Sequence, residues 1–373
     1  MHPDVVVVGA GIIGAACAEA LTARGLRVTV LDRGPVASGT SAAGEGNVLV
    51  SDKEPGPELD LAVASRERWS VLVHELREET GRDVEWEEKG GLVVATTPRA
   101  REPLEEFADR QRRAGVDACE ITPEEARELE PHLNPELTAA VHYLDDAQLN
   151  PVKATLALLE AAKRRGGTVL PHTEVSTTDG RTTVTSNGTI QSTAVINACG
   201  PWADRFGVNV RPRRGVVLVT VPMPDMVRHK VYDADYVGAA ASDDAGLQTS
   251  GVVESTQAGT ILIGSTRQRV GFDERIEPAT LKVLAQQAIA LFPMLSAVPV
   301  MRAYCGFRPY TPDHLPIIGP DPRTPGLWHA TGHEGAGIGL AAATGRLIAE
   351  LITGENPHVD PHPFRVDRPA VPA

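Results

Sequence analysis

The first 32 residues alternate between apolar runs and small residues in a way that predicts a βαβ unit. Four consecutive β-branched residues, 5–8, are typical of a strand buried on both faces of a parallel sheet. The segment Gly9-Ala10-Gly11-Ile12-Ile13-Gly14 follows at once. Residues 12–24 are rich enough in Ala, and numerous enough, for a crossover helix. A second apolar run, 28–31, then ends at Asp32.

Each small residue of this unit has a physical role in binding a dinucleotide. Gly9 allows the tight turn out of the strand, Gly11 lets the backbone approach a pyrophosphate, and Gly14 lets the helix lie close to the sheet. The helix N-terminus offers free N–H groups to the phosphates. Asp32 is placed to accept hydrogen bonds from an adenosine ribose, which argues against NADP. This pattern predicts a bound dinucleotide and leaves NAD and FAD both open.

The pattern of the remaining chain predicts further elements of the same fold. We expect a small-residue loop at 38–57 and an amphipathic helix at 59–80, followed by a charged helical region at 98–130. Asn150 and Pro151 predict the start of another helix, 151–165. Further expected elements are strands at 91–96, 168–171, 182–186, 189–190, 194–200, 215–221, 259–264 and 327–331, and a helix at 278–292.

These elements predict an α/β chain, α+β overall, with a Rossmann-like nucleotide-binding domain. A smaller, mainly antiparallel β domain for substrate is inserted into it. We expect the nucleotide-binding domain to comprise residues 1–80, 145–208 and 302–373, and the substrate domain to comprise 81–144 and 209–301. A length of 373 residues suits two such domains.

Composition narrows the classes of partner. The formal net charge of −13 makes nucleic acid and anionic membrane unfavourable partners. No apolar run approaches the length of a transmembrane helix, and we expect no signal peptide, so the expected compartment is the cytoplasm. The four cysteines are far apart, which argues against an iron–sulfur cluster, a structural zinc site or a disulfide scaffold, and we expect no metal site. A homo-oligomer or a heteromeric partner remains open.

A second concentration of glycines lies near the C-terminus. The segment Gly332-His333-Glu334-Gly335-Ala336-Gly337-Ile338-Gly339 follows a predicted strand and precedes a predicted helix. Such a segment forms a nest of backbone N–H groups with a positive helix end behind it. One nest serves the pyrophosphate, and a second suits negative charge that develops at the far end of a long redox cofactor.

Four ordered motifs resemble the D-amino acid oxidase / glycine oxidase superfamily of FAD-dependent amine oxidoreductases. They are VVVVGAGIIG…LD, SGTSAAGEGN, VINACGPWA and CGFRPYTPDHLPIIG…GHEGAGIGLAAATG, and they cover nearly the whole chain. The resemblance is strongest to glycine and sarcosine oxidases and to flavin subunits of hydroxyproline, opine and cyanide-forming glycine dehydrogenases. It implies non-covalently bound FAD held by Gly9, Ala10, Gly11, Ile13, Gly14, Asp32, Arg33, Thr40, Ser41, Gly46, Asn47, Val175, Ala198, Gly200, Trp202, Gly306, Gly332, Gly335, Ala336, Gly337 and Ile338.

The resemblance also implies an Arg that pairs with the substrate carboxylate, at the position of Arg308 in Tyr304-Cys305-Gly306-Phe307-Arg308-Pro309. A guanidinium suits this task because it binds a carboxylate with two parallel hydrogen bonds; the alternative is an Arg that only bridges two loops. We also predict catalytic roles for Asn47 and His333, although the side chain of His333 could equally point away. Cys305 is one position from the thiol that binds flavin covalently in some relatives, and a buried unreactive thiol is the favoured interpretation.

The sequence does not decide the roles of several other residues. Glu45 follows the small-residue loop and could border the substrate, and Tyr232, Tyr236 and Arg267 could line the site, but spacing does not select among them. The resulting hypothesis is oxidation of a small amino acid or N-alkyl or cyclic amino acid to an imine, with hydride transfer to flavin N5 and oxygen as acceptor. The alternatives are the flavin subunit of a heteromeric dehydrogenase, an NAD-dependent dehydrogenase and a non-catalytic assembly subunit.

Overall fold

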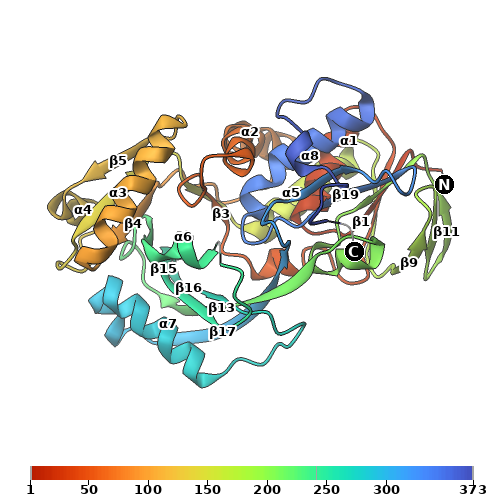
Figure 1. Cartoon of the computed structure of the whole chain (residues 1–373). Helices are drawn as coiled ribbons and strands as arrows, with labels where there is room; N and C mark the ends of the chain where they lie inside the picture. The colour runs from red at the N-terminus through yellow and green to blue at the C-terminus, as the bar shows by residue number, and fades with distance from the viewer. Residues whose placement is uncertain (1, 241, 372–373) are drawn as a thin grey trace.

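The predicted βαβ unit forms at the start of the chain. A computed structural model describes residues 2–240 and 242–371 and contains β1 (Val5–Val8), α1 (Ile12–Thr22) and β2 (Val28–Leu31). Strand β1 pairs in parallel with β2 on one side and with β12 (Ala194–Asn197) on the other. The strand predicted at 194–200 therefore lies directly beside the first strand of the chain (Figure 1).

These strands belong to a six-stranded sheet with the order β18-β19-β12-β1-β2-β8. The outer members are β8 (Thr168–Leu170), β19 (Leu327–Thr331) and β18 (Ile317–Pro320), and only the β18–β19 pair is antiparallel. The strands of this sheet therefore come from three separated segments of the chain.

Both faces of this sheet are covered, as the run of four valines predicts. Val5 and Val7 pack into a core shared with the helices, whereas Val6 and Val8 pack into a second core on the opposite face. The helical layer contains α1 with α2 (Pro57–Thr80), α5 (Pro151–Arg164) and α8 (Gly337–Thr353). The second core includes Val175 of the small sheet formed by β9 (Val175–Thr178), β10 (Thr182–Thr185) and β11 (Gly188–Gln191).

A second sheet has eight strands and is antiparallel except where β14 pairs with β4. Its order is β17 (Val300–Tyr310), β13 (Arg211–Pro222), β16 (Thr260–Arg267), β15 (Gln248–Ser255), β14 (Lys230–Asp233), β4 (Gly91–Ala95), β6 (Ala139–Tyr143) and β5 (Ala118–Ile121). The sequence did not predict β6, β14, β15 or β18 as strands, and two further features differ from the expectation. Most of β17 lies in the segment 302–373, which we assigned to the nucleotide-binding domain, and β5 interrupts the charged region 98–130 between α3 (Pro98–Arg113) and α4 (Pro123–Leu129).

The two faces of the eight-stranded sheet have different chemistry because side chains alternate along a strand. Val216 and Leu218 of β13 face α7 (Pro278–Leu291) in a hydrophobic core. Gly215 and Val217 face the opposite way and line a cavity, as do Gly306 and Arg308 of β17. This face of the second sheet is therefore available to a ligand.

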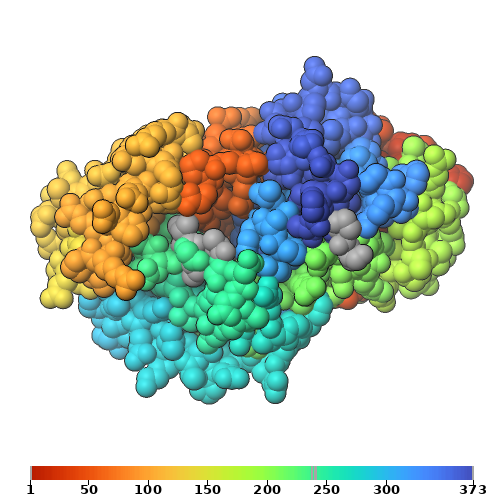
Figure 2. All heavy atoms as spheres, in the orientation of Figure 1, coloured from red at the N-terminus to blue at the C-terminus, as the bar shows by residue number. Residues whose placement is uncertain are grey.

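The remaining described elements complete the outline of the molecule. They are α6 (Asp235–Ala240), the short pair β3 (Asn47–Val48) and β7 (Ala147–Gln148), and 3-10 turns at Thr40–Ala43, Gly200–Phe206, Pro293–Ala297 and His362–Phe364. Figure 2 shows the region around α3 and α4 at one end of the molecule and the small sheet β9–β11 at the other. Across residues 2–240 and 242–371, no helix is both long enough and apolar enough to cross a membrane.

Candidate active site

A cavity of about 430 Å³ is lined by residues of both large sheets. Asp32 and the glycines after β1 line one part of it, and Arg308 of β17 lines another. Nearly all the predicted cofactor-binding residues line this cavity, including Thr40, Val175, Ala198, Gly200 and Ile338. Four do not line it: Ala10, Gly14, Gly332 and Ala336, of which Ala336 lines a smaller neighbouring cavity.

Backbone N–H groups fix Asp32 at the nucleotide part of the cavity. Oδ2 of Asp32 accepts the N–H of Ala10 at 2.8 Å, and Oδ1 accepts the N–H of Gly34 at 2.8 Å. A carboxylate oxygen accepts more than one hydrogen bond, so both oxygens can still accept from ribose hydroxyls. Ser41 Oγ similarly accepts the N–H of Ile12 at 2.9 Å at the start of α1.

The glycines of the first motif are required by close backbone approach. Gly9 has a φ of +112°, and a Cβ at this position would lie 2.3 Å from the carbonyl oxygen of Ala198. A Cβ at Gly14 would lie 1.9 Å from the carbonyl oxygen of Gly9. The role predicted for Gly14, close packing of helix on strand, explains why it lies behind the cavity wall rather than on it.

An aromatic stack borders the nucleotide part of the cavity. The Arg33 guanidinium lies 4.2 Å from the ring centroid of Trp202, and Trp202 stacks on Phe272 with centroids 5.1 Å apart. Phe272 is 44% exposed and comes from the loop before α7, so the second domain contributes to this wall. The stack is a tertiary feature that no local motif signals.

A second, smaller cavity of about 30 Å³ adjoins the first. Glu45, Asn47, Arg308 and Gly335 line both cavities, and Tyr236 is among the residues that line only the smaller one. The C-terminal glycine segment, with Gly335 and Gly337 on the wall and α8 starting at Gly337, therefore lies between the large cavity and this extension. The geometry therefore joins a long cavity to a small, compact extension at Arg308.

Arg308 is the principal cation at this junction. Its Nη1 donates to the carbonyl oxygen of Thr266 at 2.8 Å, and no carboxylate of the described residues forms an ion pair with it. Burial, together with the like charge of Arg267, lowers the pKa of Arg308 to about 10. The guanidinium is still charged at neutral pH and has N–H groups left for an anion.

Asn47, the first residue of β3, and Glu45, on the loop before it, lie opposite the second sheet. Asn47 Nδ2 is 3.4 Å from Glu45 Oε2, and Glu45 Oε1 approaches Gly264 so closely that a Cβ there would lie 2.5 Å away. Behind them is Glu254. Burial raises the pKa of Glu254 to about 7, although the charge of Lys230 acts to lower it. Glu45, whose role we left open, thus contacts the predicted residue Asn47 and acts electrostatically on the predicted residue Arg308.

His333 is on the cavity wall, but its ring forms a hydrogen bond with a buried residue of α8. Nε2 lies 3.0 Å from Thr344 Oγ1 of α8, and the residue is 3% exposed. Burial lowers the pKa of His333 to about 3, so the imidazole is neutral at physiological pH. Its catalytic role stays a prediction, and the bond to α8 gives it a clear role in fixing the glycine segment.

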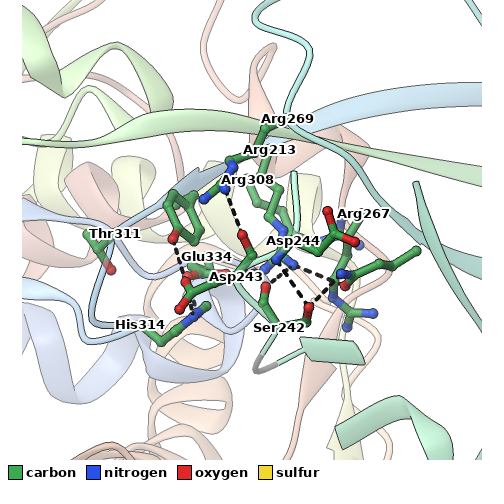
Figure 3. A network of polar contacts seen from close by, with 12 residues as sticks. Arg213, Ser242, Asp243, Asp244, Arg267, Arg269, Arg308, Thr311, His314 and Glu334 are labelled. Atoms are coloured by element: carbon green, nitrogen blue, oxygen red, sulfur yellow. Dashed lines mark hydrogen bonds and ion pairs between the residues drawn. The ribbon is translucent and has the colours of Figure 1, made fainter. Parts of the chain in front are cut away.

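A polar network joins this glycine segment to the loop after α6 (Figure 3). Glu334 pairs with Arg213 Nη1 at 3.3 Å and with His314 Nδ1 at 2.8 Å. Asp243 lies 3.3 Å from His314 Nε2 and accepts the Tyr310 hydroxyl at 2.8 Å. The bond to Glu334 raises the pKa of His314. No sequence motif signals this network, because its members come from four separated segments of the chain.

The cysteine near the predicted flavin faces away from the cavity. Cys305 lies between Tyr304 and Gly306 on β17, and its side chain packs against the core beneath α7. Its Sγ lies 3.5 Å from the carbonyl oxygen of Glu274. The period of two along the strand therefore separates Cys305 from the face of Gly306 and Arg308.

Comparison with known proteins gives a consistent result. The chain matches the DAO family model, described as FAD dependent oxidoreductase, over residues 4–351. It is 32% identical to a glycine oxidase of Geobacillus kaustophilus over 98% of this chain and 97% of that protein. The crystal structure of glycine oxidase from Geobacillus kaustophilus superimposes with a TM-score of 0.89 at 30% identity, covering 98% of this chain and 99% of the other. The hydrogen cyanide synthase subunit HcnC of Pseudomonas aeruginosa is 29% identical over 98% of this chain and 96% of that protein.

Proposed function

Because the chain belongs to the DAO family of FAD-dependent oxidoreductases, we propose that it oxidises a small amino acid or N-alkyl or cyclic amino acid to the imine. One observation carries the proposal: the unpaired Arg308 guanidinium lies on the wall shared by the cofactor cavity and the compact space beside it. A cation at that position selects a carboxylate next to the reacting carbon.

The residues present fit FAD. A carboxylate at Asp32, a glycine cradle that any Cβ would fill, and one continuous cavity from Asp32 to Gly335 suit a long dinucleotide. The bound flavin supplies the hydride acceptor. Gly335, Gly337 and the N-terminus of α8 offer a positive electrostatic environment to the flavin end of that cavity.

The protein's own residues would hold and orient the substrate. Arg308 binds the carboxylate, which fixes the direction of the Cα–H bond. Asn47 and Glu45 border the same space and offer acceptors to the amine N–H groups. Tyr236 closes the side that faces α6 and helps to exclude water from the reacting carbon.

An anaerobic amino acid screen tests this proposal. The purified holoenzyme is mixed with glycine, sarcosine, proline and the D- and L-forms of alanine, and the flavin absorbance near 450 nm is followed. We expect at least one of these substrates to bleach the absorbance within seconds to minutes. Failure of every amine to reduce a dithionite-reducible flavin would reject the proposal.

Similarity to HcnC, a subunit by name, supports a second candidate. In that case the chain is the flavin subunit of a heteromeric amino acid dehydrogenase and passes electrons to a partner or quinone. Parallel assays of oxygen uptake and artificial-dye reduction with one substrate distinguish the two. Turnover with oxygen at a rate close to that with dye supports the oxidase, and turnover with dye alone supports the dehydrogenase subunit.

A further inference from the structure

We propose that the substrate site takes an amino or imino acid with two carboxylate groups, one bound by Arg308 and the other by Arg267. This inference rests on the proposed amino acid oxidation and adds the class of substrate. It starts from an imbalance of charge in the compact part of the site, where guanidinium groups outnumber the carboxylates that face them.

Arg267 is a buried cation with weak internal partners. The residue is 4% exposed, at the end of β16. Its Nη1 donates to Ser250 Oγ at 3.4 Å and to Ser265 Oγ at 3.3 Å, and these are long hydrogen bonds to uncharged acceptors. Among the described residues no carboxylate forms an ion pair with Arg267. A guanidinium carries five N–H donors, so most of its hydrogen-bonding capacity is left for a ligand.

Arg267 lines neither cavity but lies directly next to residues that line the smaller one. Its guanidinium lies 4.5 Å from the ring centroid of Tyr236, which lines the smaller cavity. The carbonyl oxygen of Thr266, the preceding residue, holds Arg308. The charge of Arg267 acts on Arg308 strongly enough to lower its pKa. Figure 3 shows both arginines in the same close-up, next to the network around Arg213.

A count of charges shows what such a site lacks. Three guanidiniums, those of Arg213, Arg267 and Arg308, gather on neighbouring strands β13, β16 and β17. Glu334 pairs with Arg213, and Glu45 interacts electrostatically with Arg308. Lys53 and Asp52, which also line the smaller cavity, pair with each other. Among these groups, the positive charge of Arg267 therefore remains without a carboxylate. A zwitterionic monocarboxylic amino acid carries no net charge and leaves this surplus in place, whereas a second carboxylate neutralises it.

Five side chains that interact with Arg267 come from five different elements. They are Tyr236 of α6, Ser250 of β15 and Ser265 of β16, together with the cations Arg308 and Arg213. Two like charges held close in a site of low dielectric are costly unless an anion joins them. The arrangement therefore favours the fully occupied state, with an anion on each guanidinium.

Ligand binding gives a test that does not depend on turnover. Non-oxidisable acids are titrated into the holoenzyme at constant ionic strength, and the shift of the flavin absorbance spectrum reports binding. Matched pairs are malonate against propionate and succinate against butyrate. We expect the better dicarboxylate to bind at least about tenfold more tightly than its partner, which corresponds to one added charge-assisted contact. Equal affinities within both pairs would overturn the proposal.

Two variants assign the second contact to Arg267. In Arg267→Gln the preference for dicarboxylates should disappear while monocarboxylate affinity is retained, and Arg267→Lys should keep part of the preference. Arg302→Gln removes an exposed arginine of β17 and serves as the matched control, with the preference unchanged. An Arg267→Gln variant with normal flavin content that loses affinity for both acids equally, and so keeps the dicarboxylate preference, would contradict the assignment.

Turnover then separates this inference from the proposed function. The D- and L-forms of aspartate and glutamate are compared with glycine and alanine by anaerobic flavin bleaching. Faster reduction by a dicarboxylic amino acid supports both proposals. Reduction by glycine or alanine with no gain from a second carboxylate rejects the inference and leaves amino acid oxidation standing. If no amino acid reduces the flavin, the proposed function fails, and the titrations above still decide whether two carboxylates bind.

Discussion

The nucleotide part of the cavity and the substrate part are built in different ways. Around Asp32, a contiguous segment of about thirty residues supplies the strand, the turn and the helix, and backbone N–H groups make the key contacts. Around Arg308, charged side chains come from β13, β16, β17 and the loop at Glu45. Local geometry therefore fixes the first site, whereas long-range strand pairing fixes the second. We therefore expect cofactor binding to be most sensitive to substitutions that add atoms near the backbone, and substrate binding to be most sensitive to substitutions that remove a charge.

The largest expected effect comes from filling the turn at the nucleotide part. In Gly9→Ala the new Cβ would lie 2.3 Å from the Ala198 carbonyl oxygen, in a backbone conformation that Ala adopts poorly. We expect the purified variant to retain no flavin, measured as the ratio of absorbance at 450 nm to that at 280 nm. Gly25→Ala is the control, because Gly25 also has a positive φ, of 78°, but its Cβ would meet nothing within 4 Å. Full flavin content in Gly9→Ala would contradict this account.

At the substrate part, Arg308→Ala should leave the flavin bound and weaken the use of carboxylate substrates. Loss of a buried ion pair with the substrate should lower kcat/KM on the order of 100-fold to 1000-fold, mainly through KM. Steady-state kinetics with the best amino acid measure this effect. The same variant should lose little with a simple alkylamine that has no carboxylate. An equal loss with both substrates would assign Arg308 to the structure of the site rather than to recognition.

A milder change at the nucleotide part tests whether charge matters there. Asp32→Asn keeps the shape but leaves one of the two backbone N–H groups, on Ala10 or Gly34, facing an amide NH₂. We expect the Kd of FAD to rise about 10- to 100-fold, since an unsatisfied buried donor costs about 1–3 kcal/mol. Titration of the apoprotein with FAD, followed by fluorescence quenching, gives the value. A gain in affinity for FAD would reject the role of this carboxylate.

The smallest expected effect is a pH dependence confined to the substrate part. The bond to Glu334 raises the pKa of His314 above 6.5, so protonated His314 stabilises the fold below that pH. The contribution is lost as the pH rises through the raised pKa. His314→Gln should therefore lower the free energy of unfolding at pH 6 and have less effect at pH 9, where the imidazole is neutral. The expected loss at pH 6 is only about 0.5–1 kcal/mol, because the side chain is partly exposed. Urea unfolding at both pH values measures the difference, and a variant effect that grows with pH would be the wrong sign.

Much of the fold could be predicted because burial leaves a regular mark on the sequence. The valines of β1, the Asn150 cap of α5 and the glycines before α8 gave elements close to those observed. The predictions missed β6, β14 and β15 and the place of β17 in the second sheet, and β18 in the first. They also missed β5 and β9, two short strands with half their residues exposed. Such strands are defined by their hydrogen-bonding partners and carry little periodicity of their own.

The sequence by itself determined the dinucleotide cradle, since the turn, the helix dipole and the carboxylate follow one another within a single unit of the chain. It also identified Arg308 through a short motif. Only the tertiary structure decided that Arg267, Glu45 and Tyr236 surround Arg308, that Cys305 faces the opposite side of the sheet, and that Glu334 joins Arg213 to His314. The physical reason is that a strand's register with its neighbours, set by the packing of the whole sheet, determines which charges meet.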